Sequence, residues 1–292
     1  MGYVVRTAGL FLVLTLIFMG IGAIVWFFLF DGTTNSLIMI MVVFIIMATM
    51  INLFSFFFSK KIVLRAHKVK IITRADNPRL YGIVENIAMN AAMPMPQVGI
   101  TNNPTPNAFA TGRGPKDAAV VATTGLLNLL TDAELRGVMA HELAHVKNRD
   151  VLIMTIAATI AGAISILARF ALFGSMMGRR DTGTILIMLL AYITIPIAAI
   201  LIQLGISRGR EYKADLAGAR MIHDPLSLAS ALDKLENGNI ARPMSNENPS
   251  SAHMWIANPF GRRKKGGASL FSTHPPIQER IRRLNEMAGK VR

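Results

Sequence analysis

Two long stretches without charged residues open the chain. Residues 8–30 and 37–58 contain no Asp, Glu, Lys or Arg, and each is long enough to cross a bilayer as a helix. Because the linker 31–36 is short, the pattern predicts a hairpin of two transmembrane helices. The first stretch is longer than the core of a signal peptide and lacks a clear small-residue cleavage site, which favours an uncleaved anchor.

The pattern then changes to the mixed one that is typical of a soluble α+β unit, over residues 59–150. Asn77 and Pro78 begin a helix predicted to run to about Met93, with its apolar residues on one face. Short strands are predicted over 97–101 and 118–122. Residues 107–112 lie between these strands, and residues 113–117 form the predicted turn of a hairpin.

Two further apolar stretches, residues 151–177 and 184–206, allow two interpretations. They form either two more transmembrane helices or a hydrophobic hairpin that is buried in protein or lies in the membrane interface. Arg169 and the pair Arg179-Arg180 count against spanning, because they would end on the outer side. A metal ligand after residue 206 must share a compartment with ligands before residue 150. The segment therefore crosses twice or not at all, and we favour two crossings.

The chain after residue 206 is predicted to be soluble. It is helical to about Glu236 and helical again from about Pro276. Residues 237–272 between these helices are rich in Asn, Ser, Pro and Gly, which is typical of a long mobile loop. A lid, a lipid contact and plain disorder are all compatible with this composition.

Basic residues are concentrated directly after the second apolar stretch, at Lys60, Lys61, Arg65, Lys68 and Lys70. Under the positive-inside rule they place the following residues in the cytoplasm, against anionic headgroups of the lipid bilayer. The net charge of +14 therefore has a membrane explanation. No nucleic-acid-binding module is visible, so we expect no nucleic-acid partner. The chain has no cysteine, which excludes a thiol nucleophile, cysteine-ligated zinc and disulfides.

One short motif carries the chemistry, namely His141-Glu142-Leu143-Ala144-His145. It lies on a predicted helix, because Thr131 and Glu134 form a capping-box sequence and apolar residues follow at helical spacing. Two histidines four residues apart lie on one helix face and can bind one zinc ion. Glu142 is placed to take a proton from the attacking water as a general base. The alternative is a pair of solvated histidines on a surface helix.

A catalytic zinc ion needs a third protein ligand. The metzincin extension would place a glycine and a histidine at positions 148 and 151, where Asn148 and Val151 stand. Glu211 and Asp215, one helical turn apart, are the best candidates. Glu211 would bind the metal, and Asp215 would accept the ring N–H of a zinc-binding histidine, His141. Taken alone, such an acidic pair is usually a solvated helix face.

Three motifs in this order resemble those of the HtpX-type membrane metalloproteases, which are gluzincins related to the CAAX prenyl proteases. They are H-E-L-A-H at 141–145, S-R-G-R-E-Y-K-A-D at 207–215 and F-S-T-H-P-P at 271–276. The resemblance covers nearly the whole chain, including the N-terminal hairpin. It implies a bacterial or archaeal membrane endopeptidase of protein quality control and stress response, with one Zn²⁺ per chain and an active site that faces the cytoplasm.

The resemblance also gives roles to two weaker motifs. Asn107, Ala108 and Phe109 resemble the edge strand along which gluzincins align the substrate backbone, where free N–H and C=O groups bind an extended peptide. The alternative is an ordinary hairpin. His274, before Pro275, resembles the histidine that stabilises the oxyanion of the tetrahedral intermediate. The alternative is a structural histidine at the start of a helix.

The sequence thus predicts a mostly α fold with a small β-sheet, an α+β gluzincin-like protease domain, in a multi-pass membrane protein. The membrane anchor occupies residues 1–58. The halves of the protease domain occupy 59–150 and 207–292, and the hydrophobic hairpin occupies 151–206. We expect cleavage of unfolded or damaged membrane proteins at the cytoplasmic face of the cell membrane. No ATP-binding P-loop is present in the sequence, so the substrates must already be unfolded or be presented by a partner.

Two other functions compete with this interpretation. An intramembrane metalloprotease would hold its zinc inside the bilayer, and the polar residues 147–150 directly after His145 argue against it. A catalytically silent membrane scaffold or chaperone would bind exposed hydrophobic segments. The intact Glu142 argues against that function, since a protein that only binds has no need of the base.

Overall fold

In the computed structural model of the chain, the described residues are 2–29, 33–157, 159–160, 208–241, 243–244, 254–257 and 275–290. His274 and most of the predicted hairpin 151–206 lie outside the described residues, as does most of the predicted loop 237–272. The oxyanion role of His274 and the two crossings of the hairpin therefore stay predictions.

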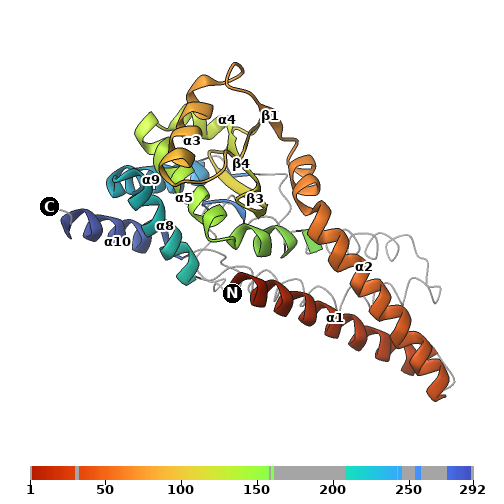
Figure 1. Cartoon of the computed structure of the whole chain (residues 1–292). Helices are drawn as coiled ribbons and strands as arrows, with labels where there is room; N and C mark the ends of the chain where they lie inside the picture. The colour runs from red at the N-terminus through yellow and green to blue at the C-terminus, as the bar shows by residue number, and fades with distance from the viewer. Residues whose placement is uncertain are drawn as a thin grey trace.

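Two long helices, α1 (Gly2–Leu29) and α2 (Thr34–Ala66), extend together from a folded domain (Figure 1). Among the described residues, α2 is long and apolar enough to cross a membrane, and Thr7–Ala23 of α1 is a shorter apolar stretch. Many large apolar side chains of α2 are exposed, which a bilayer accommodates and water does not. The structure thus supports one candidate membrane helix, and the multi-pass topology stays a prediction.

The domain contains a mixed sheet of four strands among the described residues. The strands are β1 (Lys70–Ile72), β2 (Gln97–Thr101), β3 (Ala108–Gly114) and β4 (Asp117–Thr123), in the spatial order β1-β2-β4-β3. β2 and β4 are parallel, and the other two pairs are antiparallel. β3 is therefore an edge strand, as the likeness to gluzincins implied.

The hairpin between β3 and β4 depends on glycine. Gly112 has a φ of +131°, and a Cβ there would lie 2.0 Å from the carbonyl oxygen of Asp117 on the partner strand. A side chain at this position would therefore both strain the backbone and clash with β4. The register of the two strands shifts between Gly112 and Gly114, which marks a β-bulge.

Helices cover the sheet and complete the domain. They are α3 (Pro78–Asn90), α4 (Thr124–Leu129), α5 (Asp132–Lys147), α8 (Arg208–Ile222), α9 (Pro225–Ala241) and α10 (Ile277–Lys290). The mostly helical fold with a small sheet that the sequence predicts is confirmed. The predicted boundary at Glu236 is wrong, because α9 continues to Ala241.

The two faces of the sheet pack against different partners, because successive side chains of a strand point to opposite sides. Alanines and valines such as Ala110 and Val120 face a core shared with α3, α5 and α9. Phe109 and Val121 face the other side, where they pack with Val63 near the end of α2. The candidate membrane helix α2 therefore reaches directly into the domain that carries the sheet.

Glu134 joins the start of α5 to α9. Its carboxylate accepts hydrogen bonds from the backbone N–H of Thr131 at 2.9 Å, from Ser230 Oγ at 2.7 Å and from Lys234 Nζ at 2.8 Å. The hydroxyl of Thr131 in turn accepts from the N–H of Glu134, which completes the predicted capping box. Partial burial raises the pKa of Glu134, but these hydrogen bonds outweigh it and hold the pKa at about 2.

Replacing Glu134 by Gln should destabilise the folded domain at neutral pH and have little effect in acid. Gln keeps the capping acceptor, but the lost ion pair with Lys234 and the loss of one acceptor oxygen should cost about 1–3 kcal/mol. Because the pKa is lowered from 4.5 to about 2, the stabilisation is fully present above pH 4.5 and is lost as the pH falls towards 2. Thermal unfolding in detergent between pH 7 and 2.5 measures this. A stability difference that does not depend on pH would contradict the assignment.

Candidate functional site

The site forms where α5 and α8 pack at close range. A Cβ on Gly218 of α8 would lie 2.8 Å from the backbone nitrogen of His141 on α5, so a glycine is needed for this approach. Asp215 lies about one turn and Glu211 about two turns before Gly218, on the same side of α8. The contact therefore places both carboxylates against the face of α5 that carries His141 and His145. The two carboxylates and the two imidazoles are all buried.

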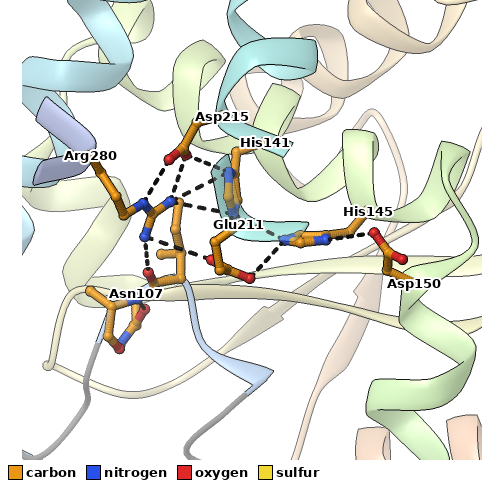
Figure 2. A network of polar contacts seen from close by, with 9 residues as sticks. Asn107, His141, His145, Asp150, Glu211, Asp215 and Arg280 are labelled. Carbon is orange, nitrogen blue, oxygen red and sulfur yellow. Dashed lines mark hydrogen bonds and ion pairs between the residues drawn. The ribbon is translucent and has the colours of Figure 1, made fainter. Parts of the chain in front are cut away.

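Three buried donor atoms converge on one point between these helices (Figure 2). His145 Nε2 lies 3.2 Å from His141 Nε2 and 3.3 Å from Glu211 Oε1, and His141 Nε2 lies 3.8 Å from Glu211 Oε2. A tetrahedral zinc ion with ligands at about 2.0–2.1 Å separates its ligand atoms by roughly 3.3 Å. Both the donor set and its spacing fit zinc.

The Nδ1 atom of each imidazole, which points away from the proposed metal position, faces a carboxylate. His141 Nδ1 lies 2.9 Å from Asp215 Oδ1, and His145 Nδ1 lies 3.5 Å from Asp150 Oδ2. A carboxylate at Nδ1 favours the tautomer with the proton on that nitrogen. The two Nε2 atoms lie 3.2 Å apart, so a metal ion can bind between them.

The electrostatics of the cluster also favour a cation. Burial opposes the charged form of His145, but the carboxylates of Glu211, Asp150 and Glu142 outweigh burial and raise its pKa to about 10. Burial lowers the pKa of His141 despite its contact with Asp215, which keeps that imidazole neutral. A neutral histidine beside an excess of carboxylates is the environment that a metal ion requires.

Glu142 points from α5 towards the edge strand β3. Burial raises its pKa to about 7, and the charge of Glu211 adds to this rise, while a hydrogen bond from the backbone N–H of Ala110 acts in the opposite direction. A carboxylate with a pKa near the working pH is well suited to accept and return a proton. The hydrogen bond also fixes the carboxylate of Glu142 next to the outer edge of β3.

Arg280 of α10 closes the cluster, and the sequence interpretation missed it. Its side chain is fully buried. Nε and Nη2 donate to the two oxygens of Asp215 at 2.8 and 2.7 Å, and Nη1 donates to the carbonyl of Ile256 at 2.9 Å (Figure 2). Burial raises the pKa of Asp215, but Arg280 and His141 outweigh it and hold that pKa at about 2. Asp215 therefore stays charged opposite His141.

The edge of β3 carries the residues assigned to substrate binding, and the chain itself covers them. Asn107, Ala108 and Phe109 are completely buried. Residues 254–257 lie along them, within the segment that the sequence predicted to be a mobile loop. These four residues are all buried, and the mobility of the segment stays a prediction. The structure therefore brings together His141, Glu142, His145, Glu211, Asp215 and the β3 edge, whereas His274 lies outside the described residues.

Comparisons with known proteins agree with this geometry. The sequence profile of Peptidase family M48 matches residues 74–288. Three similar relatives carry the description "Protease HtpX homolog". The relative from Syntrophobacter fumaroxidans is 48% identical and covers 85% of this chain and 89% of its own. Those from Pyrococcus abyssi and Pyrococcus furiosus are 46% and 47% identical and cover 99% of this chain, with 97% and 98% of their own lengths matched.

The fold is also found among solved structures. One of them is Ste24p from S. mikatae, with a TM-score of 0.50 and 18% sequence identity. The match covers 93% of this chain and 62% of that chain, so the solved protein is considerably longer. At this identity the likeness concerns the fold.

Proposed function

The chain belongs to peptidase family M48 and is a metallopeptidase, and from this premise we propose that it is a zinc-dependent endopeptidase of the cell membrane. Its substrates would be unfolded or damaged membrane proteins, cleaved at the cytoplasmic face as part of protein quality control and stress response. The observation that carries the proposal is the convergence of His141, His145 and Glu211 beside Glu142 and an edge strand.

His141, His145 and Glu211 would hold one zinc ion, which acts as a Lewis acid on the attacking water and on the scissile carbonyl. Asp215 orients the ring of His141 through its Nδ1, and Asp150 faces Nδ1 of His145 in the same way. Such outer carboxylates fix the tautomer and raise the basicity of the ligand. Arg280 fixes Asp215 in turn through its two-pronged ion pair.

Glu142 would act as the general base. It takes the proton from the attacking water and then returns it to the leaving amine. His274 is proposed to donate a hydrogen bond to the oxyanion of the tetrahedral intermediate, as the likeness to HtpX-type proteases implies. Its position six residues before Arg280 in the sequence is compatible with that role.

The substrate backbone would lie along β3, next to Asn107, Ala108 and Phe109. An edge strand binds an extended peptide through main-chain hydrogen bonds, which every unfolded polypeptide can make. A folded protein has already satisfied these groups within its own structure. This mode of binding supports a substrate class defined by unfolding.

A basic pocket supports a partnership with anionic lipids. It measures about 630 Å³ and lies where α2 enters the domain, lined among others by Lys60, Lys61, Arg65, Lys68 and Arg113. Lys60 and Arg113 pair with Asp117 at 2.9 and 2.7 Å. Within the described part of the chain, the structure shows no carboxylate partner for Lys61, Arg65 or Lys68. Free cations at the end of a membrane helix attract anionic headgroups.

The decisive experiment compares cleavage of an unfolded and a folded substrate by the purified full chain in detergent. We expect cleavage of a permanently unfolded protein such as casein, loss of this activity in a chelator and recovery on adding one equivalent of zinc. A tightly folded protein should resist cleavage. Zinc binding without cleavage would point to the scaffold function, and full activity after verified removal of the metal would overturn the proposal.

The proposed orientation can be tested with topology reporters. Fusions after Lys61, within residues 237–272 and at Arg292 should report the cytoplasm, and a fusion within 31–36 should report the outside. A fusion near Arg179 should report the outside if residues 151–206 cross twice. Because the zinc ligands come from both sides of that segment, finding Lys61 and Arg292 on opposite faces would contradict the proposed site.

A further inference from the structure

Residues 254–257 lie against the outer edge of β3 and are joined to it by hydrogen bonds. The N–H of Ile256 donates to the carbonyl of Ala108 at 3.0 Å. The side-chain amide of Asn107 donates to the carbonyl of Ala257 at 2.8 Å and accepts from its N–H at 3.3 Å. The amide of Asn107 thus imitates a peptide group and satisfies both main-chain groups of Ala257. The contact of Ile256 with Ala108 uses the same main-chain group of β3 that would bind an extended peptide.

Trp255 anchors the segment in an aromatic pocket. Its ring meets the ring of Phe109 edge to face, with centroids 4.8 Å apart, and the ring of His67 at 5.2 Å. Val63, Val121, Met244 and Met254 belong to the same cluster. The pocket is therefore built from the end of α2 and from the face of the sheet that turns away from the main core.

The segment is also connected to the catalytic groups. Arg280 donates to the carbonyl of Ile256 at 2.9 Å with the same guanidinium that pairs with Asp215. Further along the β3 edge, the N–H of Ala110 donates to Glu142. The same edge of β3 thus contacts Ile256 through Ala108 and the proposed base, Glu142, through Ala110. A substrate aligned on β3 would need the positions that residues 255–257 occupy.

We propose that Trp255, Ile256 and Ala257 bind as an internal substitute for the substrate, and that the pocket filled by Trp255 is a subsite for a large aromatic side chain of the substrate. The inference rests on the proposed function. It adds selectivity to a site that otherwise recognises backbone, because the subsite favours unfolded segments that carry Trp, Phe or Tyr. Such segments are buried in folded proteins and exposed in damaged ones.

The indole nitrogen of Trp255 weakens the binding of residues 255–257 to the edge of β3, so that a substrate can displace them. Within the described residues, Nε1 of Trp255 is buried and has no hydrogen-bond partner. A buried donor without an acceptor destabilises the bound arrangement. Phe would fill the same pocket without leaving a donor unsatisfied. An incoming substrate with Phe at this position therefore competes favourably with the internal segment.

A reversible cross-link tests the occupancy. The chain has no cysteine, so Ala108→Cys with Ile256→Cys introduces a single pair. Ile256 and Ala108 share a backbone hydrogen bond of 3.0 Å, and both side chains belong to the same core cluster. A hydrogen bond of this length brings the two Cα atoms near the roughly 4.4–6.8 Å at which disulfides form. Oxidation should lower casein cleavage at least about tenfold, and a reductant that does not chelate metals should restore it. Ile256→Cys alone should not respond to the oxidant.

Three outcomes decide the cross-linking experiment. Failure of the disulfide to form would overturn the pairing of Ile256 with Ala108. Cross-linked protein that cleaves as fast as its reduced form would overturn the competition with substrate. Absence of cleavage in the reduced double variant and in the unmodified chain alike would instead count against the proposed function.

Peptide competition tests the aromatic subsite with the unmodified chain. A synthetic peptide of residues 252–259 should inhibit cleavage of a fluorogenic reporter competitively, raising KM and leaving kcat unchanged. The matched peptide with Trp255→Ala keeps His253, so metal binding by that histidine is held constant. We expect it to inhibit about tenfold or more weakly, and a Trp255→Phe peptide to inhibit at least as well. Equal inhibition by the Trp and Ala peptides, or none by either, would overturn the subsite.

Discussion

The variant Glu142→Gln should keep zinc at about one equivalent per chain while proteolysis falls by about 10²–10⁴-fold, the usual contribution of a general base. Gln is nearly isosteric, leaves His141, His145 and Glu211 in place and still accepts the hydrogen bond from the N–H of Ala110. It lacks the basic oxygen that removes a proton from water. Metal analysis together with casein cleavage measures both quantities on one preparation.

Substrate binding provides the control for Glu142→Gln. Because the β3 edge is unchanged, the variant should bind an unfolded substrate with an affinity close to that of the parent chain. A variant that retains near-normal cleavage would show that another group activates the water. One that loses its zinc would show that Glu142 supports the metal site, and either result contradicts the assigned role.

Glu211→Ala should abolish activity by a different route, through loss of the metal itself. Removing one of three ligands leaves two imidazoles, too few for tight binding of a catalytic zinc ion. Dialysis against a weak chelator should strip zinc from this variant and leave the parent chain loaded. Measured activity should fall below the detection limit at ordinary zinc concentrations.

Asp215→Asn is the matched comparison on the same helix face. It removes the charge at His141 Nδ1 but leaves all three ligands, so zinc affinity should weaken by about 10–100-fold rather than disappear. High zinc concentrations should then rescue Asp215→Asn and fail to rescue Glu211→Ala. Tight zinc binding by Glu211→Ala would show that the third ligand is a different residue.

The parts of the site that the sequence predicted are those that depend on local spacing. Two histidines one helical turn apart share a helix face in any context, and the same holds for Glu211 and Asp215. The capping box of Thr131 and Glu134 marks the start of the helix from neighbouring residues alone. The edge position of β3 was implied by likeness to known proteases, because strand order is a property of the whole sheet.

The parts that the sequence did not predict depend on contacts between distant segments. Arg280 lies on a helix with many charged residues, and nothing in its immediate sequence distinguishes it from its exposed neighbours Arg282 and Arg283. It is recognised by the partners that bury it, Asp215 and the carbonyl of Ile256. Residues 254–257 are a short apolar segment within a stretch rich in Asn, Ser, Pro and Gly. Because the prediction used the composition of the whole stretch, it did not recognise that these four residues could pack against the sheet edge.

The order of the site residues along the chain has a consequence for biosynthesis. His141 and His145 precede the hydrophobic segment 151–206, whereas Glu211, Asp215 and Arg280 follow it. A ribosome that has just completed α5 has made two of the proposed metal ligands and the proposed base, but the proposed third ligand has not yet been made. The protease therefore cannot acquire a complete metal site until the segment between its two halves has been synthesised. If the proposed ligands hold the zinc ion, a chain whose second half has not yet been made would be unable to cut its neighbours.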